Sequence, residues 1–199
     1  MRFIFIPFPL FFLLSMGDLE EEVSTDWASA FSLNGEHKIA KSSLLTTLPR
    51  LTKEWRVTFD VKPGKYHRGW ASVIHMTIGG KGGEEGDRIP GVWFHKARGI
   101  LISTALNGNP SYHHFSKPLP SVGEWIQMEI SQSLLFSTRY VYMINIANKN
   151  VLTKTNTKPM EFTDVKVFAG SQWYPGQKGS IKNLKIEIMA PISHPPPYG

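Results

Sequence analysis

Three carboxylates lie close together in a glycine-rich stretch of the chain. Glu84, Glu85 and Asp87 fall within four residues of the run Gly79–Gly91. Calcium binds several oxygen ligands, and glycines allow backbone carbonyls to turn inward and add to them. The stretch therefore predicts a calcium site, although its spacing differs from the acidic repeat of a helix–loop–helix calcium loop. A solvated acidic loop is the alternative, and Asp87 could also pair with Arg88 to staple the loop.

A second group of candidates depends on how side chains alternate along two predicted strands, residues 70–78 and 92–95. The side chains expected to face the core are Ile74, Met76, Ile78, Val92 and Phe94. The side chains expected to face outward are then Val73, His75, Thr77, Trp93 and His95. Neighbouring strands would bring His75, Trp93 and His95 onto one open face.

Such a face would suit a sugar. An exposed Trp93 would offer a flat apolar platform, and the two histidines would offer hydrogen bonds. The alternative is a second layer that covers the face and makes the same residues part of a core. Paired histidines could also bind zinc, but no third ligand stands at a characteristic spacing.

A third group combines aromatic and amide side chains in turn-rich segments. Trp173-Tyr174-Pro175 stands among glycines, and we expect it to lie near Asn107-Gly-Asn-Pro110 and Tyr112-His-His114. Aromatic and amide side chains on loops are common in ligand sites, although ordinary loop packing is the alternative. The ligand-binding candidates are His75, Arg88, Trp93, His95, Asn107, Tyr112, Trp173 and Tyr174.

The elements that must position these residues are strands. Residues 54–62 alternate strictly, with Val57, Phe59 and Val61 inward, and residues 124–130 and 140–146 alternate in the same way. Residues 165–169 and 180–188 close the domain, and we expect a bulge near Asn183. No segment of ten or more residues has helical periodicity. Many short strands between glycine and proline turns predict an all-β, two-sheet antiparallel sandwich.

The two ends of the sequence differ from the body. Residues 1–17 have an early Arg2, the apolar run Phe3–Leu14 and small residues after it, which predicts a secretory signal peptide. A buried first strand or helix is the alternative, which Pro7 and Pro9 disfavour for a helix. We expect residues 18–26 to be a flexible acidic lead-in, 27–189 to be a single domain and 190–199 to be an extended proline-rich tail.

The body of the chain is basic. The whole sequence has 22 lysines and arginines against 16 acids, and from Trp27 onward the counts are 21 and 11. A basic exported domain attracts polyanions such as sulfated glycans or anionic lipid surfaces, whereas a solubilising lysine surface is the alternative. Nucleic acid is disfavoured because no recognition motif is present. The absence of cysteine excludes disulfides, a thiol nucleophile and cysteine zinc sites.

Several segments together resemble a known superfamily. Trp70…His75, the glycine-rich loop, Gly91-Val-Trp-Phe and Gly99-Ile-Leu-Ile-Ser are similar to strands of the laminin-G and concanavalin-A-like lectin jelly rolls. Gly123-Glu-Trp-Ile-Gln-Met-Glu-Ile and the closing run Val165–Ile186 fit the same pattern. The resemblance implies a single jelly-roll domain that binds glycans or extracellular proteins, often with calcium.

An enzyme is disfavoured. Glycoside hydrolases need two carboxyl groups about 5–9 Å apart across a cleft, whereas the acids here crowd on one loop. The Glu-x-Asp-x-x-Glu motif of similar glucanases and the Gly-x-Ser-x-Gly elbow are both absent. We therefore expect a secreted, non-enzymatic module that binds glycans, anionic ones included. The alternatives are an extracellular matrix or secreted protein-interaction module, and then a glycoside hydrolase.

Overall fold

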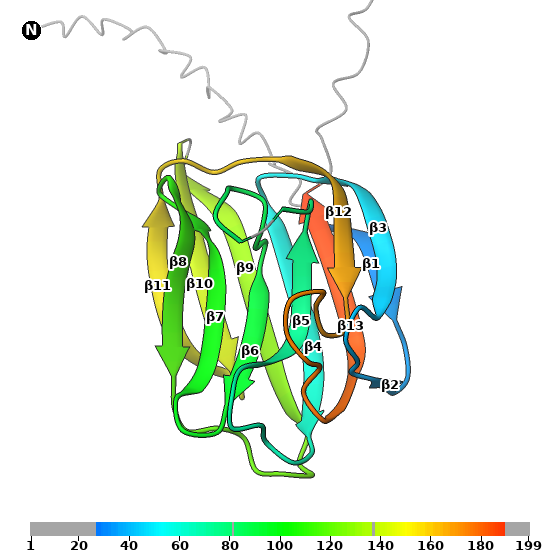
Figure 1. Ribbon diagram of the computed structural model, residues 1–199. Helices are drawn as coiled ribbons and strands as arrows, with labels where there is room; N and C mark the ends of the chain where they lie inside the picture. The colour runs from blue at the N-terminus through cyan, green and yellow to red at the C-terminus, as the bar shows by residue number, and fades with distance from the viewer. Residues whose placement is uncertain (1–26, 81, 137, 190–199) are drawn as a thin grey trace, which may run out of the picture.

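The computed structural model describes residues 27–80, 82–136 and 138–189. The predicted signal peptide, acidic lead-in and proline-rich tail lie outside the described residues. Within these ranges the regular secondary structure consists of strands, which form two antiparallel sheets stacked face to face (Figure 1). The predicted all-β, two-sheet fold is confirmed. None of the described segments forms a helix that could cross a membrane.

The first sheet, called sheet A, has the strand order β1-β13-β4-β9-β10-β11, and β2 pairs with β13. Its strands are β1 (Trp27–Leu33), β2 (His37–Lys38), β4 (Trp55–Pro63), β9 (Ile126–Phe136), β10 (Arg139–Ile146), β11 (Lys149–Asn156) and β13 (Gly179–Met189). The second, called sheet B, has the order β3-β12-β5-β6-β7-β8. Its strands are β3 (Leu44–Leu51), β5 (Ala71–Thr77), β6 (Gly91–His95), β7 (Gly99–Leu106), β8 (Asn109–Ser116) and β12 (Phe162–Phe168).

The core lies between the two sheets and follows from alternation along the strands. In β4 every second side chain is buried, and Val57, Phe59 and Val61 face sheet B as the sequence predicts. Sheet B supplies the facing layer with Val92 and Phe94 of β6, again as predicted. Burying one large apolar side chain contributes about 1.5–3 kcal/mol, so this layer holds the sheets together.

Among the irregularities in strand pairing, two bear on the sequence predictions, and one of these was predicted. Asn183 has a positive φ of 52°, and the pairing of β13 with β4 shifts there, which confirms the expected bulge. In β5 the pairing with β6 shifts between Ser72 and Ile74. Val73 is therefore buried in the core, and the prediction that it faces outward is wrong. Ile78, expected in the core, is 43% exposed.

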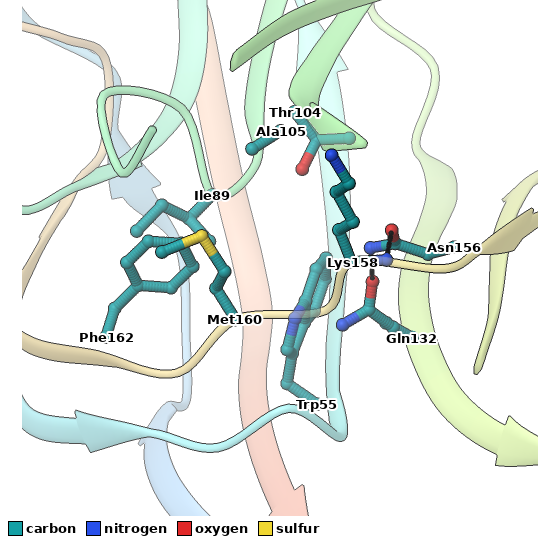
Figure 2. Close-up of a pocket in the computed structure, with 9 residues that line it drawn as sticks. All are labelled: Trp55, Ile89, Thr104, Ala105, Gln132, Asn156, Lys158, Met160 and Phe162. Atoms are coloured by element: carbon teal, nitrogen blue, oxygen red, sulfur yellow. Dashed lines mark hydrogen bonds between the residues drawn. The ribbon is translucent and has the colours of Figure 1, made fainter. Parts of the chain in front are cut away.

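A buried chain of amides joins the sheets at one end. Asn156 ends β11, and its Nδ2 donates to Gln132 Oε1 at 2.6 Å, while Gln132 Nε2 donates to the Lys53 carbonyl at 2.7 Å. Figure 2 shows this pair on one side of a small hollow and the apolar side chains of Met160 and Phe162 on the other. The hollow measures roughly 10 Å³, room for one water molecule at most. This end of the sandwich is therefore closed to any ligand larger than a water molecule.

Candidate functional site

The centre of the site is a buried imidazole on the outer face of sheet B. His75 is 1% exposed, and its Nε2 lies 2.7 Å from the carbonyl oxygen of Asp87. A carbonyl only accepts, so Nε2 carries the proton. Its ring contacts two indoles at a tilt, with ring centroids 4.4 Å away at Trp173 and 5.6 Å away at Trp93. Burial lowers the pKa of His75 to about 4, so the ring is neutral at pH 7.

A loop of residues 169–178, called the covering loop, lies over this histidine. In Figure 1 it crosses β5 as the orange segment between β12 and β13. Ser72 of β5 donates its backbone N–H to the Pro175 carbonyl, and its hydroxyl bonds the Ser171 hydroxyl at 2.7 Å. Ser171 Oγ also accepts the backbone N–H groups of Trp173 and Tyr174, each at 3.1 Å. These bonds fix where the two aromatic rings stand.

Beside the covering loop the outer face forms an open groove of about 250 Å³. It is lined by Trp70, Arg88, Trp93, Arg98, Leu101, His113, Phe115 and Tyr174. The register of the sheet explains part of this set, because Trp93, Leu101 and Phe115 are cross-strand neighbours on β6, β7 and β8. Phe115 is 53% exposed and Tyr174 is 40% exposed, so both rings are available to a ligand.

The indole of Trp93 forms the floor of the groove and is 2% exposed. One edge of its ring occupies the space beside Gly91, where a Cβ would come within 2.0 Å of the indole. The predicted face therefore exists, with His75 and Trp93 together on it, but the covering loop buries both. His95 lies on the same face, with its ring 4.9 Å from that of Trp70.

Arg88 is half-buried at the wall of the groove and is held from several sides. Its Nη1 donates to the Gly82 carbonyl and, at 2.6 Å, to the Ser111 hydroxyl. Its guanidinium lies 5.0 Å from the ring centroid of Trp173, a distance typical of a cation–π contact. Burial lowers the pKa of Arg88, an effect that the nearby charge of Asp87 opposes. Arginine remains charged even so.

The carboxylates of the acidic loop, residues 78–80 and 82–90, differ in their burial and hydrogen bonding. Asp87 is buried, and its Oδ2 accepts the backbone N–H groups of Gly82 at 2.6 Å and Glu84 at 3.0 Å. Asp87 and Arg88 do not form the expected ion pair within the described residues. They staple the loop through Gly82, since Asp87 binds its N–H and Arg88 its carbonyl.

The calcium site stays a prediction. Glu84 is exposed, Glu85 is half-buried, and Asp87 is engaged with backbone amides. Across the segments that the structure describes, no three His, Asp or Glu side chains gather in a way that could hold a metal ion. The geometry therefore gives Asp87 a structural task that does not need calcium.

Of the eight predicted ligand residues, Arg88, Trp93 and Tyr174 line the groove. His75, His95 and Trp173 do not line it but each contacts a residue that does.

The other two predicted ligand residues lie elsewhere. Asn107 is in the turn between β7 and β8, where its Nδ2 donates to the Thr155 carbonyl and its Oδ1 accepts the Thr157 N–H at 2.6 Å. Tyr112 lies in β8 rather than in a loop, and it packs against the core, with Lys154 Nζ 5.2 Å from its ring centroid. Both residues stabilise the sandwich where β8 approaches β11.

Five groove residues were missed from the sequence: Trp70, Arg98, Leu101, His113 and Phe115. The alternation of Ser111, His113 and Phe115 along β8 could have revealed one of the lining strands. Pro110 and the polar neighbours of this segment favoured a loop instead. Arg98 belongs to the tight turn between β6 and β7, and nothing in its local sequence separates it from an ordinary surface arginine.

Neither a protein-family profile nor a curated protein sequence matches the chain, but solved structures do. The heptameric SAP-like pentraxin from Limulus polyphemus has a TM-score of 0.51 at 14% identity, covering 78% of this chain and 73% of that one. The CBM40 of the Ruminococcus gnavus IT-sialidase, bound to α2,3 sialyllactose, has a TM-score of 0.52 at 13% identity, covering 80% and 92%. Domain 4 of an extracellular arabinanase from Geobacillus stearothermophilus, in complex with arabinotriose, has a TM-score of 0.53 at 13% identity, covering 79% and 84%.

At these identities the likeness establishes the fold alone. The fold is a concanavalin-A-like jelly roll, which confirms the architecture that the sequence resemblance implied. Carbohydrate-binding domains are among the solved structures that share it.

The first prediction concerns Asp87. Asp87→Asn keeps the shape but removes the charge that two backbone amides bind, so it should lower the free energy of unfolding by about 1–2 kcal/mol. Urea unfolding in the presence of EDTA measures this loss. Glu84→Gln is the control, since this exposed side chain should change stability by less than about 0.5 kcal/mol. Equal stability of wild type and Asp87→Asn would contradict the anchoring role.

The same proteins check the calcium prediction. If the acidic loop binds calcium, millimolar calcium should raise the melting temperature of the wild type, a chelator should reverse the rise, and Asp87→Asn should abolish most of it. A wild-type melting temperature that is indifferent to calcium refutes the metal site.

The second prediction concerns pH. An unfolded histidine has a pKa near 6.5, whereas the pKa of folded His75 is about 4, so the unfolded chain binds the extra proton between these values. Folding stability should therefore fall as the pH drops from about 6.5 to about 4, by roughly 3 kcal/mol in total. His75→Gln, whose amide can still donate to the Asp87 carbonyl, should lack this part of the slope. Urea unfolding at several pH values compares the two proteins, and parallel curves would show that His75 does not titrate this way.

Proposed function

We propose that the chain is a glycan-binding protein and that the groove on the outer face of sheet B is its binding site. The observation that carries the proposal is the lining itself, which combines exposed aromatic rings with arginine side chains. Sugar rings present apolar C–H faces and polar hydroxyls, and this lining offers a partner for each. The occurrence of glycan-bound domains of the same fold supports the proposal.

The rings divide the groove into walls and floor. Tyr174 stands on the covering loop, and its ring centroid is 6.4 Å from that of Trp93. On the other side, the ring centroids of Trp70 and Phe115 lie 6.1 Å apart. A sugar ring between these walls would stack on one of them and reach the arginine donors at its edge. The open shape suits the end or an inner residue of a chain better than a fully enclosed small molecule.

We propose binding without catalysis. Glycoside hydrolysis needs a pair of carboxyl groups beside the scissile bond. None of the residues that line the groove is an aspartate or a glutamate. His113 and Tyr174 are the lining residues whose side chains could transfer a proton, and the pKa of His113 is lowered by burial and by the charge of Arg88. His113 serves as a neutral hydrogen-bonding group.

The third prediction tests the site. Tyr174→Ala and Phe115→Ala should each weaken the best ligand of a glycan array by about 1–2 kcal/mol, which is roughly 5- to 30-fold in Kd. Isothermal titration calorimetry measures the change. Leu135→Ala is the matched control, because this β9 side chain is similarly exposed but belongs to sheet A. Unchanged affinity in both groove variants would place the binding elsewhere.

A folded protein that retains no glycan would contradict the proposed function itself. Protein partners captured through the groove, with loss of capture in Tyr174→Ala, would instead support the alternative of an extracellular protein-interaction module.

We also propose that the protein is exported, on the strength of the apolar pattern in residues 1–17. The fourth prediction follows. Mass spectrometry of the protein collected outside its own cells should find a new N-terminus within a few residues of Asp18. An intact Met1 on that protein would contradict the signal peptide.

A further inference from the structure

Arg88 has no carboxylate partner although it is half-buried. Four salt bridges occur within the described residues, and neither Arg88 nor Arg98 takes part in one. Arginines that leave water are usually paired, because an unpaired charge in a poorly solvated place is costly. Asp87 does not fill the role, since its Oδ2 is spent on two backbone amides. The guanidinium therefore has no carboxylate in direct contact, although the charge of Asp87 lies nearby.

The free edge of this guanidinium has a definite shape. Nη1 is engaged with the Gly82 carbonyl and the Ser111 hydroxyl, and the ring of Trp173 covers one face. The Nε and Nη2 donors have no hydrogen-bond acceptor among the described residues. These two donors form the edge that Arg50 uses on one carboxylate, where Nε and Nη2 both bind Glu161 Oε2 at 3.1 and 2.7 Å. Such an edge fits a planar carboxylate with two parallel hydrogen bonds.

On the side of the groove formed by β6, β7 and β8 the formally charged side chains share one sign, whereas the acidic loop beside Arg88 carries Glu84, Glu85 and Asp87. The sequence from Arg88 to Gly123 supplies β6, β7, β8 and their turns, and it contains no aspartate or glutamate. It contains Arg98, which lines the groove, and two lysines close to it in the fold, Lys96 in the same turn and Lys117 just after β8. Lys96 binds the His67 carbonyl through its N–H at 3.1 Å, and the side chain of Lys117 lies against Gly99. A concentration of one charge around a groove attracts ligands of the opposite charge.

We propose that the groove recognises a carboxylated sugar, whose carboxylate binds the Nε and Nη2 edge of Arg88 while Arg98 supplies a second positive charge at the open rim. This proposal rests on the proposed glycan site and specifies its ligand class. The sugar ring stacks on the aromatic walls, and its acid group supplies the carboxylate contact that Arg88 lacks. Neutral sugars reach the same walls but leave Arg88 unpaired.

The test compares acidic oligosaccharides with their neutral counterparts. The probes are trigalacturonic acid, a hyaluronan tetrasaccharide and sialyllactose, each beside its carboxyl-reduced form, together with a heparin-derived tetrasaccharide as a sulfated arm. Wild-type protein should bind at least one carboxylated probe about tenfold or more tightly than the reduced form. Arg88→Gln should abolish that preference, and Arg98→Gln should weaken the acidic probe about two- to fivefold, an effect that fades at high salt.

Two further variants keep the test decisive. Arg88→Lys retains the charge but lacks the fork, so it should lose most of the carboxylate preference. The melting temperatures of Arg88→Lys and Arg88→Gln show whether each variant stays folded. Binding is compared among those proteins that melt cooperatively. If both Arg88 variants unfold, the affinity of Arg98→Gln for the acidic probe tests the proposal in their place. Arg139→Gln in β10 of sheet A is the control for loss of a surface arginine, and it should bind like the wild type.

The outcomes separate the two proposals. Equal affinity for acidic and carboxyl-reduced probes, lost in Tyr174→Ala but not in the arginine variants, would overturn the carboxylate proposal and leave the glycan site in place. Preference for the sulfated probe alone, retained in Arg88→Lys, would overturn the carboxylate proposal as well. Binding of no probe, by protein that also retains nothing on a glycan array, would overturn both.

Discussion

The arrangement of the outer face of sheet B depends on the burial of one neutral imidazole. His75 donates to the Asp87 carbonyl, and this hydrogen bond holds the acidic loop against β5. The ring of His75 also packs against the indole of Trp173, and this contact helps to position the covering loop. Each loop then brings one wall residue to the groove, Arg88 from the acidic loop and Tyr174 from the covering loop. A charged imidazole would lose solvation between two indoles, so the neutral form and the shape of the site are linked. The site is thus built on strand β5 but formed by two loops that meet there.

The same burial explains why the groove differs from the face that alternation alone predicts. The covering loop takes the place of solvent over His75 and Trp93, so the indole that looks like an exposed platform in the sequence becomes a floor. Gly91 permits this, because the indole needs the space that a Cβ would occupy. The rings that reach solvent belong to Phe115, at an outer strand, and Tyr174, on the loop. The aromatic rings accessible to a ligand therefore lie around the buried cluster of His75 and Trp93, whereas the sequence predicts that Trp93 itself is accessible.

Much of the fold could be predicted from local patterns, whereas of the groove only Arg88, Trp93 and Tyr174 could. Strict alternation identified β4 and its inward side chains, and a break in alternation located the bulge at Asn183. The bulge at Val73 was missed because every residue of β5 is buried, so its sequence alternates on neither face. The groove joins residues from four separate segments, and proximity of that kind comes from tertiary pairing that a single sequence does not display. Asn107 and Tyr112 were assigned to the site because amides and aromatics suit sugars, but the same chemistry serves here to clamp β8 to β11.

The edges of both sheets bear on how copies of the protein behave beside one another. Strands β8 and β11 end their sheets on one side, as β1 and β3 do on the other. Open strand edges invite pairing with a second copy, and lysine and proline discourage it. Pro110 lies in β8, Pro49 in β3, and Lys154 of β11 leans over the ring of Tyr112. Where copies of the protein meet at high local concentration, these residues would keep them from pairing into a continuous sheet.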